Sequence, residues 1–420
     1  MGYRLFNPQL QKEIRDSFYY IEKSPYAGER IFLDSVSGAL RLKKMVEAVS
    51  RESASYAQVN RVDPASDHFD QVVAKFKEDV RDLIGAEDGE IMTAMSGTHT
   101  VYRLVNAVLK AHENNGNLVT SNLEHPAVYE ATWYFSKEYN IEKRVAPFDP
   151  QSGQVKAETI LDKVDENTCL LALIHASNVT GAVNNIEYII KEARKINPEI
   201  YIIIDGVQYS PHGLIDISTI NPDAYVLSGY KLFAKKYTGI AYMSDRMAHL
   251  EHWRFREKPM NVWSLGAEDE ATYAGFSAVV DYLDWLGSKF NQSDNRRDRI
   301  ATAMDRIHEH TKGLLNLALY GDDGIKGLKE IEHVTLHGIE DNIEGRTGLI
   351  AFRIKGQDST EMAEKYFKEG GISLSTRQRN IYARHVLEQL NVEDLIRLSI
   401  CHYNIPEEIK SFLKFTENLI

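Results

Sequence analysis

Cysteine is scarce in this chain. Among its 420 residues only Cys169 and Cys401 are cysteines, too few for a disulfide framework and without the spacing of metal ligands. We therefore expect a protein of a reducing compartment, the cytoplasm, and predict no metal site. Cys169 lies in the apolar segment "CLLALIHAS", which favours a place in the core.

Long apolar runs and an excess of basic charge are also missing. No stretch of about 18 apolar residues exists, so no transmembrane helix is expected. The N-terminal segment "MGYRLFNPQLQKEIRDSF" has no apolar core of the kind found in secretory signals. The formal net charge of −12 argues against nucleic acid and against anionic membrane surfaces as partners. What remains is a globular protein of ordinary composition, without repeats or low-complexity segments.

The first two thirds of the chain alternate short apolar runs with helical patterns. Runs such as "CLLALI", "YIIID" and "AYVLS" are apolar almost throughout, as in strands that are buried on both faces. The segment 72–85, "VVAKFKEDVRDLIG", has helical periodicity and ends at Gly85. This alternation predicts an α/β fold with a mostly parallel, mixed sheet flanked by helices.

The pattern changes near residue 290. A long, highly charged helix is predicted over 293–319, and the short strand-like runs "HVTLHGI", "TGLIAFRI", "GISLST" and "LIRLSI" follow it. Strands mixed with helices in this way indicate a smaller α+β domain. We predict a large domain over 26–290 and a small domain formed by 1–25 and 291–420.

Polar side chains follow almost every strand-like run. In open α/β sheets, ligands bind at the carboxyl ends of the strands, so these residues are the candidates for a site. They are Ser35, Ser37, Gly97, Thr98, His99, Glu124, His125, His175, Asn178, Asp205, Gln208, Ser228, Tyr230 and Lys231.

The segment "MSGTHTVYRL" places Ser-Gly-Thr where a strand turns into a helix. The free N–H groups of such a turn bind anions, and Thr98 adds a hydroxyl donor. A simple helix cap is the commoner explanation for this pattern. Both interpretations remain open at this point.

Asp205 and Lys231 each end an apolar run. A carboxylate at Asp205 could pair with a protonated ring nitrogen, or it could cap the next turn. A desolvated amine at Lys231 would suit Schiff-base chemistry, whereas most lysines are solvated surface charges. Lys235 and Lys236 are rival lysines, and their surroundings are typical of a solvated loop.

These elements are more specific together than singly. An anion site, a histidine at a strand end, Asp-x-x-Gln and Ser-x-x-Lys follow one another along one predicted sheet. Pyridoxal 5'-phosphate (PLP) needs an anion site, a ring-stacking group, a carboxylate and a lysine. The sequence therefore predicts a PLP site.

The same segments resemble a known family. "HASNVTGAVNNI", "IIIDGVQYSPHGLIDI", "DAYVLSGYKLF" and "IRLSICHYNIPEEI" are similar to the class V aminotransferase family, and most of all to its cysteine desulfurase branch. The resemblance extends over nearly the whole chain. It implies the fold-type I architecture of PLP enzymes, an amino-acid substrate, and a homodimer with the active site at the subunit interface.

The resemblance also implies roles for individual residues. Lys231 would form the Schiff base with the cofactor, Asp205 would pair with the ring nitrogen, and His125 would stack on the ring. Arg397 would bind the carboxylate of the substrate. The remaining cofactor contacts would be Gly97, Thr98, His99, Asn178, Gln208, Ser228, Tyr230 and, from the partner subunit, Ala267; Ser37 and Asn178 would contact the substrate.

The chain departs from the desulfurase pattern at one critical place. Cysteine desulfurases carry a nucleophilic cysteine on a loop that matches "GISLSTRQRNIYARHVLEQL", and this segment has none. Tyr382 and Ala383 stand near the expected place. Cys401 lies in the last strand motif, where it does not match that cysteine. We therefore expect no persulfide mechanism.

Several outcomes are open to such an enzyme after a proton is removed from Cα. A C–S lyase is favoured, a class V aminotransferase is the alternative, and an epimerase is a third. A non-catalytic scaffold is disfavoured, because Lys231, Asp205, His125 and Gln208 are all present. Three arginines, Arg377, Arg379 and Arg384, could recognise a second acidic group on the substrate or could form a solvated basic loop.

Overall fold

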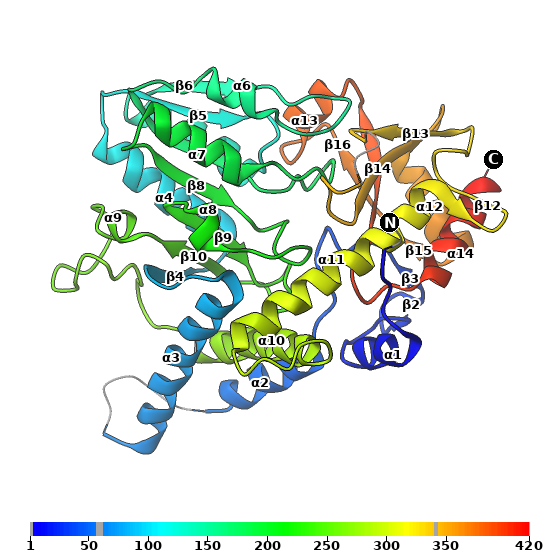
Figure 1. Ribbon diagram of the computed structural model, residues 1–420, viewed down its shortest axis with the longest axis horizontal. Helices are drawn as coiled ribbons and strands as arrows, with labels where there is room; N and C mark the ends of the chain where they lie inside the picture. The colour runs from blue at the N-terminus through cyan, green and yellow to red at the C-terminus, as the bar shows by residue number, and fades with distance from the viewer. Residues whose placement is uncertain (1–2, 56–61, 340–342, 420) are drawn as a thin grey trace.

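The structure, a computed structural model, describes residues 3–55, 62–339 and 343–419. Within these ranges the larger sheet has seven strands, of which β10 runs antiparallel to both of its neighbours while the remaining pairs are parallel. The predicted mostly parallel, mixed sheet is thus present (Figure 1). In spatial order the strands are β4 (Glu90–Ala94), β10 (Gly239–Met243), β9 (Ala224–Ser228), β8 (Tyr201–Asp205), β7 (Thr168–Ile174), β5 (Asn117–Ser121) and β6 (Glu142–Ala146).

Helices cover both faces of this sheet, which explains its continuously apolar strands. Leu170 and Ala172 of β7 pack into the cluster that contains α4 and α5, whereas Leu171 and Leu173 pack into the cluster that contains α7 and α10. Alternate residues of one strand therefore serve opposite layers. The helices around the sheet are α2 (Lys43–Ser53), α3 (Pro64–Ile84), α4 (Gly97–Ala111), α5 (Pro126–Glu138), α6 (Ala157–Leu161), α7 (Ile186–Ile196), α8 (Ile217–Ile220), α9 (Asp245–Ala248) and α10 (Glu270–Ser288).

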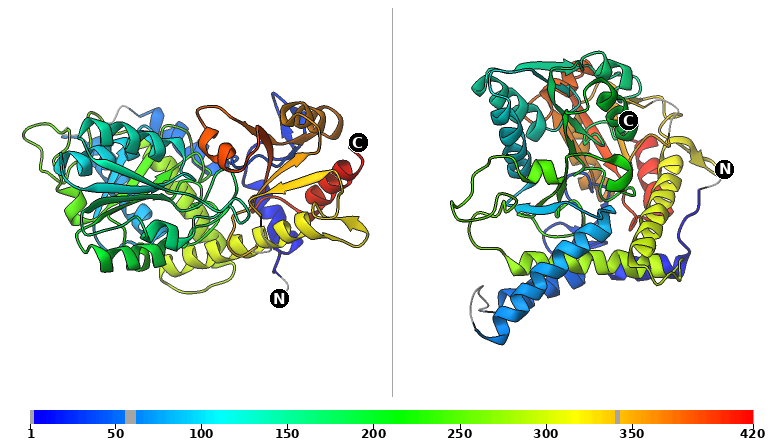
Figure 2. Two further views of the ribbon diagram at one scale, coloured as in Figure 1. Left: turned by 90° about the horizontal axis from the view of Figure 1, so that it is seen from above. Right: turned by 60° about the vertical axis from the view of Figure 1, so that its left-hand side comes forward.

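The smaller sheet is antiparallel and lies beside the larger one (Figure 2). Its four strands, among the described residues, pack against α12 and α14 over a separate apolar cluster. Each of the four predicted C-terminal runs contributes, although "GISLST" is divided between β15 and β16. The elements of this region are β13 (Val334–His337), β14 (Leu349–Ile354), β17 (Asp394–Ser399), β16 (Ser375–Gln378), β15 (Ile372–Ser373), α12 (Ser359–Gly370), α13 (Arg384–Gln389) and α14 (Pro406–Glu417).

One long helix connects the two sheets. α11 (Arg296–Tyr320) runs from the larger sheet to the smaller one (Figures 1 and 2). Ile300 and Ile307 belong to the core cluster of the larger sheet, while Leu314 and Leu315 belong to that of the smaller sheet. The same helix is therefore embedded in both cores.

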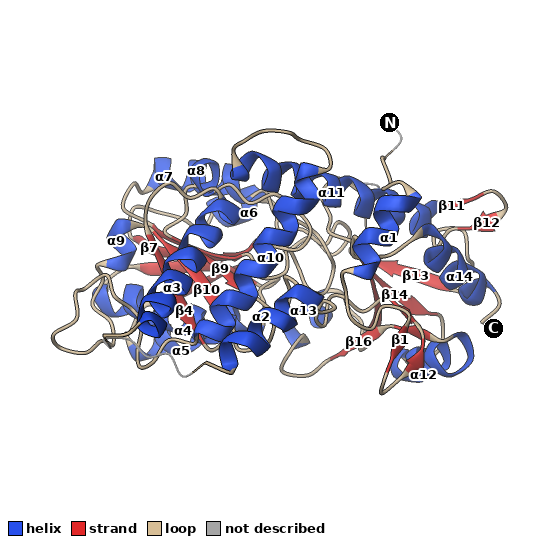
Figure 3. Cartoon of the chain, turned by 90° about the horizontal axis from the view of Figure 1, so that it is seen from below, coloured by secondary structure: helices blue, strands red, loops and turns tan. Residues whose placement is uncertain are grey.

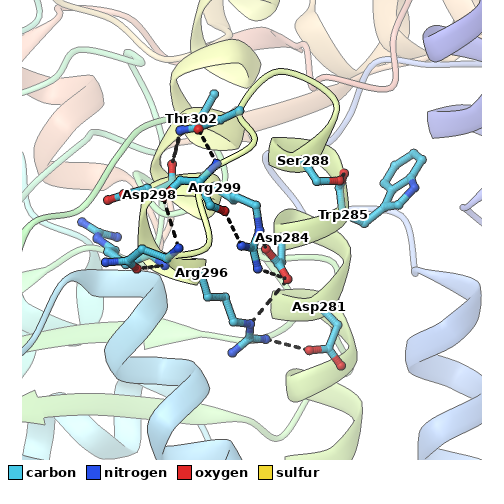
Figure 4. Close-up of polar contacts among 12 residues, drawn as sticks. Asp281, Asp284, Trp285, Ser288, Arg296, Asp298, Arg299 and Thr302 are labelled. Atoms are coloured by element: carbon cyan, nitrogen blue, oxygen red, sulfur yellow. Dashed lines mark hydrogen bonds and ion pairs between the residues drawn. The ribbon is translucent and has the colours of Figure 1, made fainter.

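Ion pairs fasten the start of α11 to α10, as Figure 4 shows. Nε of Arg299 lies 2.5 Å from Oδ1 of Asp284, and Nη2 of Arg296 lies 2.6 Å from Oδ1 of Asp281. Both arginines are less than a quarter exposed. Such partly shielded pairs hold more firmly than fully solvated ones.

The N-terminal helix α1 (Pro8–Asp16) packs against the C-terminal segment (Figure 3). Gln11 donates to the carbonyl of His402 at 3.1 Å, and Arg15 pairs with Glu408 at 2.9 Å.

The division into a large domain over 26–290 and a small domain formed by 1–25 and 291–420 stays a prediction. The short strands that complete the fold are β1 (Lys23–Ser24), β2 (Gly28–Glu29), β3 (Ile31–Phe32), β11 (Gly321–Asp322) and β12 (Ile325–Lys326).

The strand expected in "IFLDSVSGA" is shorter than the pattern suggests. Regular pairing covers only Ile31 and Phe32, against β15. At Leu33 the backbone changes partner, because Leu33 N–H donates to Ser373 while its carbonyl accepts from Ser399 on β17. The ladder ends there, and the segment that follows turns towards the larger sheet.

No helix among the described residues is long and apolar enough to cross a membrane.

Candidate active site

A cavity lies at the carboxyl ends of β8 and β9, beside the N-terminus of α4. The elements therefore meet where the strand-end argument places a ligand site. Ile174, Ser96, Ala127 and Val207 contribute to its wall. Nine of the predicted site residues also line it: Gly97, Thr98, His125, Asn178, Asp205, Gln208, Ser228, Tyr230 and Lys231.

The N-terminus of α4 confirms the helix cap in "MSGTHTVYRL", and the anion site there stays a prediction. Ser96 is the cap, since its Oγ accepts the His99 N–H at 3.1 Å. Thr98 lies in the first turn, where helix N–H groups have no intrahelical acceptor and attract anions. A Cβ on Gly97 would lie 3.2 Å from the side chain of Val207, so glycine allows the helix to approach β8 closely.

Asp205 is the last residue of β8 and is only 3% exposed. Its Oδ1 accepts the Val207 N–H at 3.0 Å. Burial raises the pKa of Asp205 to about 6, against the opposing effects of that hydrogen bond and of Lys231. A cation placed in the cavity would stabilise the ionised form.

Lys231 is 7% exposed and points into the cavity wall. Its Nζ donates to the carbonyl of Val36 and, at 3.3 Å, to Oε1 of Gln208. The pKa of Lys231 is lowered to about 7. Burial is the main cause, the charges of Arg397 and Arg377 act in the same direction, and Asp34 and Asp205 act against them. The amine is thus available in its uncharged, nucleophilic form near neutral pH.

The rival lysines lie outside the cavity, Lys235 half-buried and Lys236 exposed. Lys235 forms an ion pair with Asp269 at 3.1 Å, and Lys236 is exposed. Of the three lysines, Lys231 alone lines the cavity.

His125 caps α5 and faces the cavity. Its Nδ1 accepts the Ala127 N–H at 3.1 Å, so the ring proton of the neutral form belongs on Nε2. Burial lowers the pKa of His125 to about 3, and the charges of Lys231 and Arg377 act in the same direction. The ring is therefore neutral, as stacking on a flat cofactor requires.

The three predicted substrate contacts, Ser37, Asn178 and Arg397, are joined by hydrogen bonds. Arg397 is fully buried on β17, and its Nη1 donates to the carbonyl of Asn178 at 2.7 Å. Its Nη2 donates to Ser375 Oγ at 3.0 Å and to Ser37 Oγ at 3.4 Å. Burial lowers the pKa of Arg397 to about 9, and Arg377 adds to this effect.

Two predicted cofactor contacts lie in a neighbouring groove. His99 and Ala267 line it together with Met95, Tyr237 and Leu265. Both His99 and Ala267 are exposed. Because Ala267 was predicted to act on the site of a partner subunit, its position within one chain does not test that role, and both contacts stay predictions.

Three further strand-end candidates support the site from outside the cavity wall. Oε1 of Glu124 accepts from Ser121 Oγ at 2.6 Å. Nδ1 of His175 lies 2.7 Å from Tyr225 Oη. Ser35 bonds to Tyr403. Each is buried.

Sequence reasoning missed Asp34 and Val36. Asp34 influences the charges of Lys231, Arg377 and Arg397. Its position just after the run "IFL" is the same signal that selected Ser35 and Ser37. The carbonyl of Val36 gives no sequence signal, since any residue supplies one.

The surroundings of the three arginines and of the two cysteines show which of them are paired, exposed or buried. The half-buried Arg379 pairs with the exposed Glu393 at 2.9 Å, and Arg384 lies 3.7 Å from Glu388 at the surface. Arg377 instead shares a face of the smaller sheet with Arg397, and its charge acts on Lys231 and His125. Both cysteines are buried, and burial raises the pKa of each thiol to about 12.

A sequence model of the aminotransferase class-V family matches residues 31–412. The chain belongs to this family. A probable cysteine desulfurase from Borreliella burgdorferi is 26% identical over 364 residues, which cover 81% of this chain and 79% of the relative. A cysteine desulfurase from Salmonella choleraesuis is 24% identical over 422 residues, which cover 95% of each.

Solved structures of the same family share the fold. A cysteine desulfurase from Thermococcus onnurineus superposes with a TM-score of 0.82 at 18% identity, covering 100% of this chain and 99% of the other. A cysteine desulfurase from Escherichia coli gives 0.79 at 20% identity, covering 99% and 98%. The predicted fold-type I architecture is confirmed.

Class V aminotransferases and cysteine desulfurases depend on PLP, and this chain is a PLP-dependent enzyme of that family. The cavity fits the cofactor on its own evidence. It combines a helix N-terminus, a buried carboxylate, a neutral imidazole and a buried amine, which are the four groups that PLP requires.

Proposed function

We propose that this enzyme is a C–S lyase that eliminates a sulfur substituent from Cβ of a cysteine derivative without forming a persulfide. The observation that carries the proposal is a buried Lys231 amine facing Asp205 across a cavity, in a chain whose two cysteines are both buried with thiol pKa values of about 12. Desulfuration through a persulfide needs a thiolate nucleophile. Elimination needs only a base at Cα and a leaving group at Cβ.

Each cavity residue has a defined task in this proposal. Gly97, Thr98, Ser228 and Tyr230 would hold the cofactor phosphate, Asp205 would hold the ring nitrogen, and His125 would cover the ring face. PLP, when bound, draws electrons away from Cα of an amino acid joined to it. Lys231 supplies the amine that anchors the cofactor.

Lys231 also moves the proton. Its uncharged Nζ takes the proton from Cα, and the Cβ–S bond breaks with the electron pair leaving on sulfur. The sulfur product departs as a thiol or thiolate. With one water molecule consumed, the cysteine derivative yields pyruvate, ammonium and the thiol. A lysine with a pKa of about 7 suits this task, because a general base works best near the ambient pH.

We also propose a homodimer located in the cytoplasm. The groove that contains His99 and Ala267 borders the cavity and exposes Met95, Tyr237 and Leu265. Clustered exposed apolar side chains of this kind mark interaction sites. Sedimentation analysis of the purified protein should give twice the mass of one chain, and a monomer that binds PLP fully would contradict the dimer.

An absorption spectrum with product analysis tests the function. The wild-type protein should show a band near ~420 nm after PLP is added. Lys231→Ala should lose or shift that band, and Lys235→Ala should keep it, since Lys235 does not line the cavity. With a cysteine thioether, release of pyruvate and a thiol in equal amounts supports the lyase. Formation of a keto acid that keeps the sulfur, with the cofactor left as its amine, would instead identify an aminotransferase.

A further inference from the structure

Two arginines share one face of the smaller sheet. In the antiparallel pair β16–β17, Ser375 stands opposite Arg397 and Arg377 stands opposite Leu395. Residues directly opposite each other point to the same face, and so do residues two apart on one strand. Arg377 and Arg397 are therefore diagonal neighbours, with Cβ atoms roughly 7 Å apart.

Both arginines act on residues of the active site. Nη1 of Arg397 holds the carbonyl of Asn178, whose side chain lines the cavity. The charge of Arg377 acts on Lys231 and on His125, both of which line the same cavity. The pair thus approaches the cavity from the smaller sheet, whereas the helix N-terminus at Gly97 belongs to the larger one.

Neither guanidinium has an acidic partner. Over residues 3–55, 62–339 and 343–419, no carboxylate lies within ion-pair distance of Arg377 or Arg397. The Nε–H group of each is buried and donates a hydrogen bond to no described atom. Asp34 acts on both from a longer range, and its Oδ1 already accepts from Ser37 Oγ at 2.7 Å.

Arginines on β14 and just after β16 do have acidic partners. Arg353 pairs with Asp394 at 2.9 Å, and Arg379 pairs with Glu393 at 2.9 Å. Two like charges held close together and partly buried are costly unless an anion compensates them. Arg377 and Arg397 form such a pair, and the charges of both act on Lys231 in the cavity, where an anionic ligand would compensate them.

We propose that the substrate is an amino acid with a second anionic group at the end of its side chain, held by Arg377 while Arg397 holds the α-carboxylate. Guanidinium groups bind carboxylates and other oxyanions through two parallel hydrogen bonds. The phosphate of the cofactor has its own donors on α4 and leaves this pair free. The inference rests on the proposed function only in placing an amino acid beside Lys231.

A pair of isosteric substrates tests the charge requirement. S-carboxymethyl-L-cysteine ends in a carboxylate, and S-carbamidomethyl-L-cysteine ends in a neutral amide of the same shape. The kcat/KM of the wild-type holoenzyme should be roughly 30-fold higher for the acid than for the amide. Hydrogen bonds to a charged group typically contribute a factor of this size. Arg377→Gln should remove the preference by lowering kcat/KM for the acid alone. The control Arg379→Gln should keep it, because Arg379 is already paired with the exposed Glu393.

A binding measurement separates this inference from the proposed reaction. Succinate and its neutral-ended analogue succinamate are titrated calorimetrically into the holoenzyme and into Arg377→Gln, whose melting temperature and cofactor band check that it is folded. Tighter binding of succinate that depends on Arg377 supports the inference even when neither thioether is cleaved, and in that case only the lyase proposal fails. Equal binding of the two compounds, or a succinate preference that survives in Arg377→Gln, overturns the inference whatever the reaction is.

Discussion

The two sheets contribute to the active site in different ways. The larger sheet presents a lysine, a carboxylate and an imidazole at strand ends and helix starts, each placed by its own local segment. The smaller sheet presents two arginines from the faces of neighbouring strands. The residues expected to hold the cofactor are placed by local turns, while those expected to bind the substrate are placed by strand register. Each side can be altered separately.

Loss of Asp205 should produce the largest effect. Asp205→Ala removes the buried carboxylate from the cofactor side, and a preorganised charge of this kind is worth about 10²- to 10³-fold in rate. We expect kcat to fall by that factor, PLP to dissociate more readily, and KM to change little. Steady-state kinetics measures kcat and KM, and dialysis against cofactor-free buffer measures the loss of PLP. An unchanged kcat would mean that the larger sheet does not control the electronics of the cofactor.

Loss of Arg397 should act on the other side. Arg397→Gln should leave the absorption band of the cofactor in place and raise KM by roughly 30-fold, since hydrogen bonds to the substrate carboxylate are lost. Because Arg397 is fully buried, the melting temperature of the Arg397→Gln variant must be compared with that of the wild type. A variant that folds but loses the cofactor band would break the proposed division between the two sheets.

The pH dependence of cofactor uptake should show a smaller and graded effect. Only the uncharged Lys231 amine attacks the aldehyde, and its pKa is lowered to about 7. The rate of PLP uptake by the apoenzyme should therefore be constant above pH 7 and fall about tenfold for each unit below it. Absorbance after rapid mixing follows the process. A rate that still rises steeply between pH 8 and 10 would indicate an ordinary, solvated lysine.

The sequence was sufficient for residues whose role depends on their own segment. Lys231, Asp205 and His125 each follow a recognisable strand-like run, and the structure brings them to one cavity. The edge strand β6 was not predicted, because "EKRVA" is rich in charge, as is common at the edge of a sheet. "GISLST" divides into two strands because its partner changes from β3 to β17.

Contacts between distant segments were beyond the reach of the sequence pattern. The carbonyl of Val36 lies 195 residues from Lys231 along the chain, and only the fold brings them together. The three arginines of the basic loop appear alike in the sequence, yet Arg379 and Arg384 have acidic partners while Arg377 shares a face of the smaller sheet with Arg397. Side-chain direction in this loop is set by its pairing with β17, which no local pattern reveals.

The helix α11 gives the two-sided site a fixed dimension. Its 25 residues form a rod about 37 Å long, with one end anchored in the core of each sheet. A rod shared in this way keeps the lysine and the arginines at a set separation. Under the proposed binding mode, this fixed separation would determine which length of substrate reaches from Lys231 to Arg377.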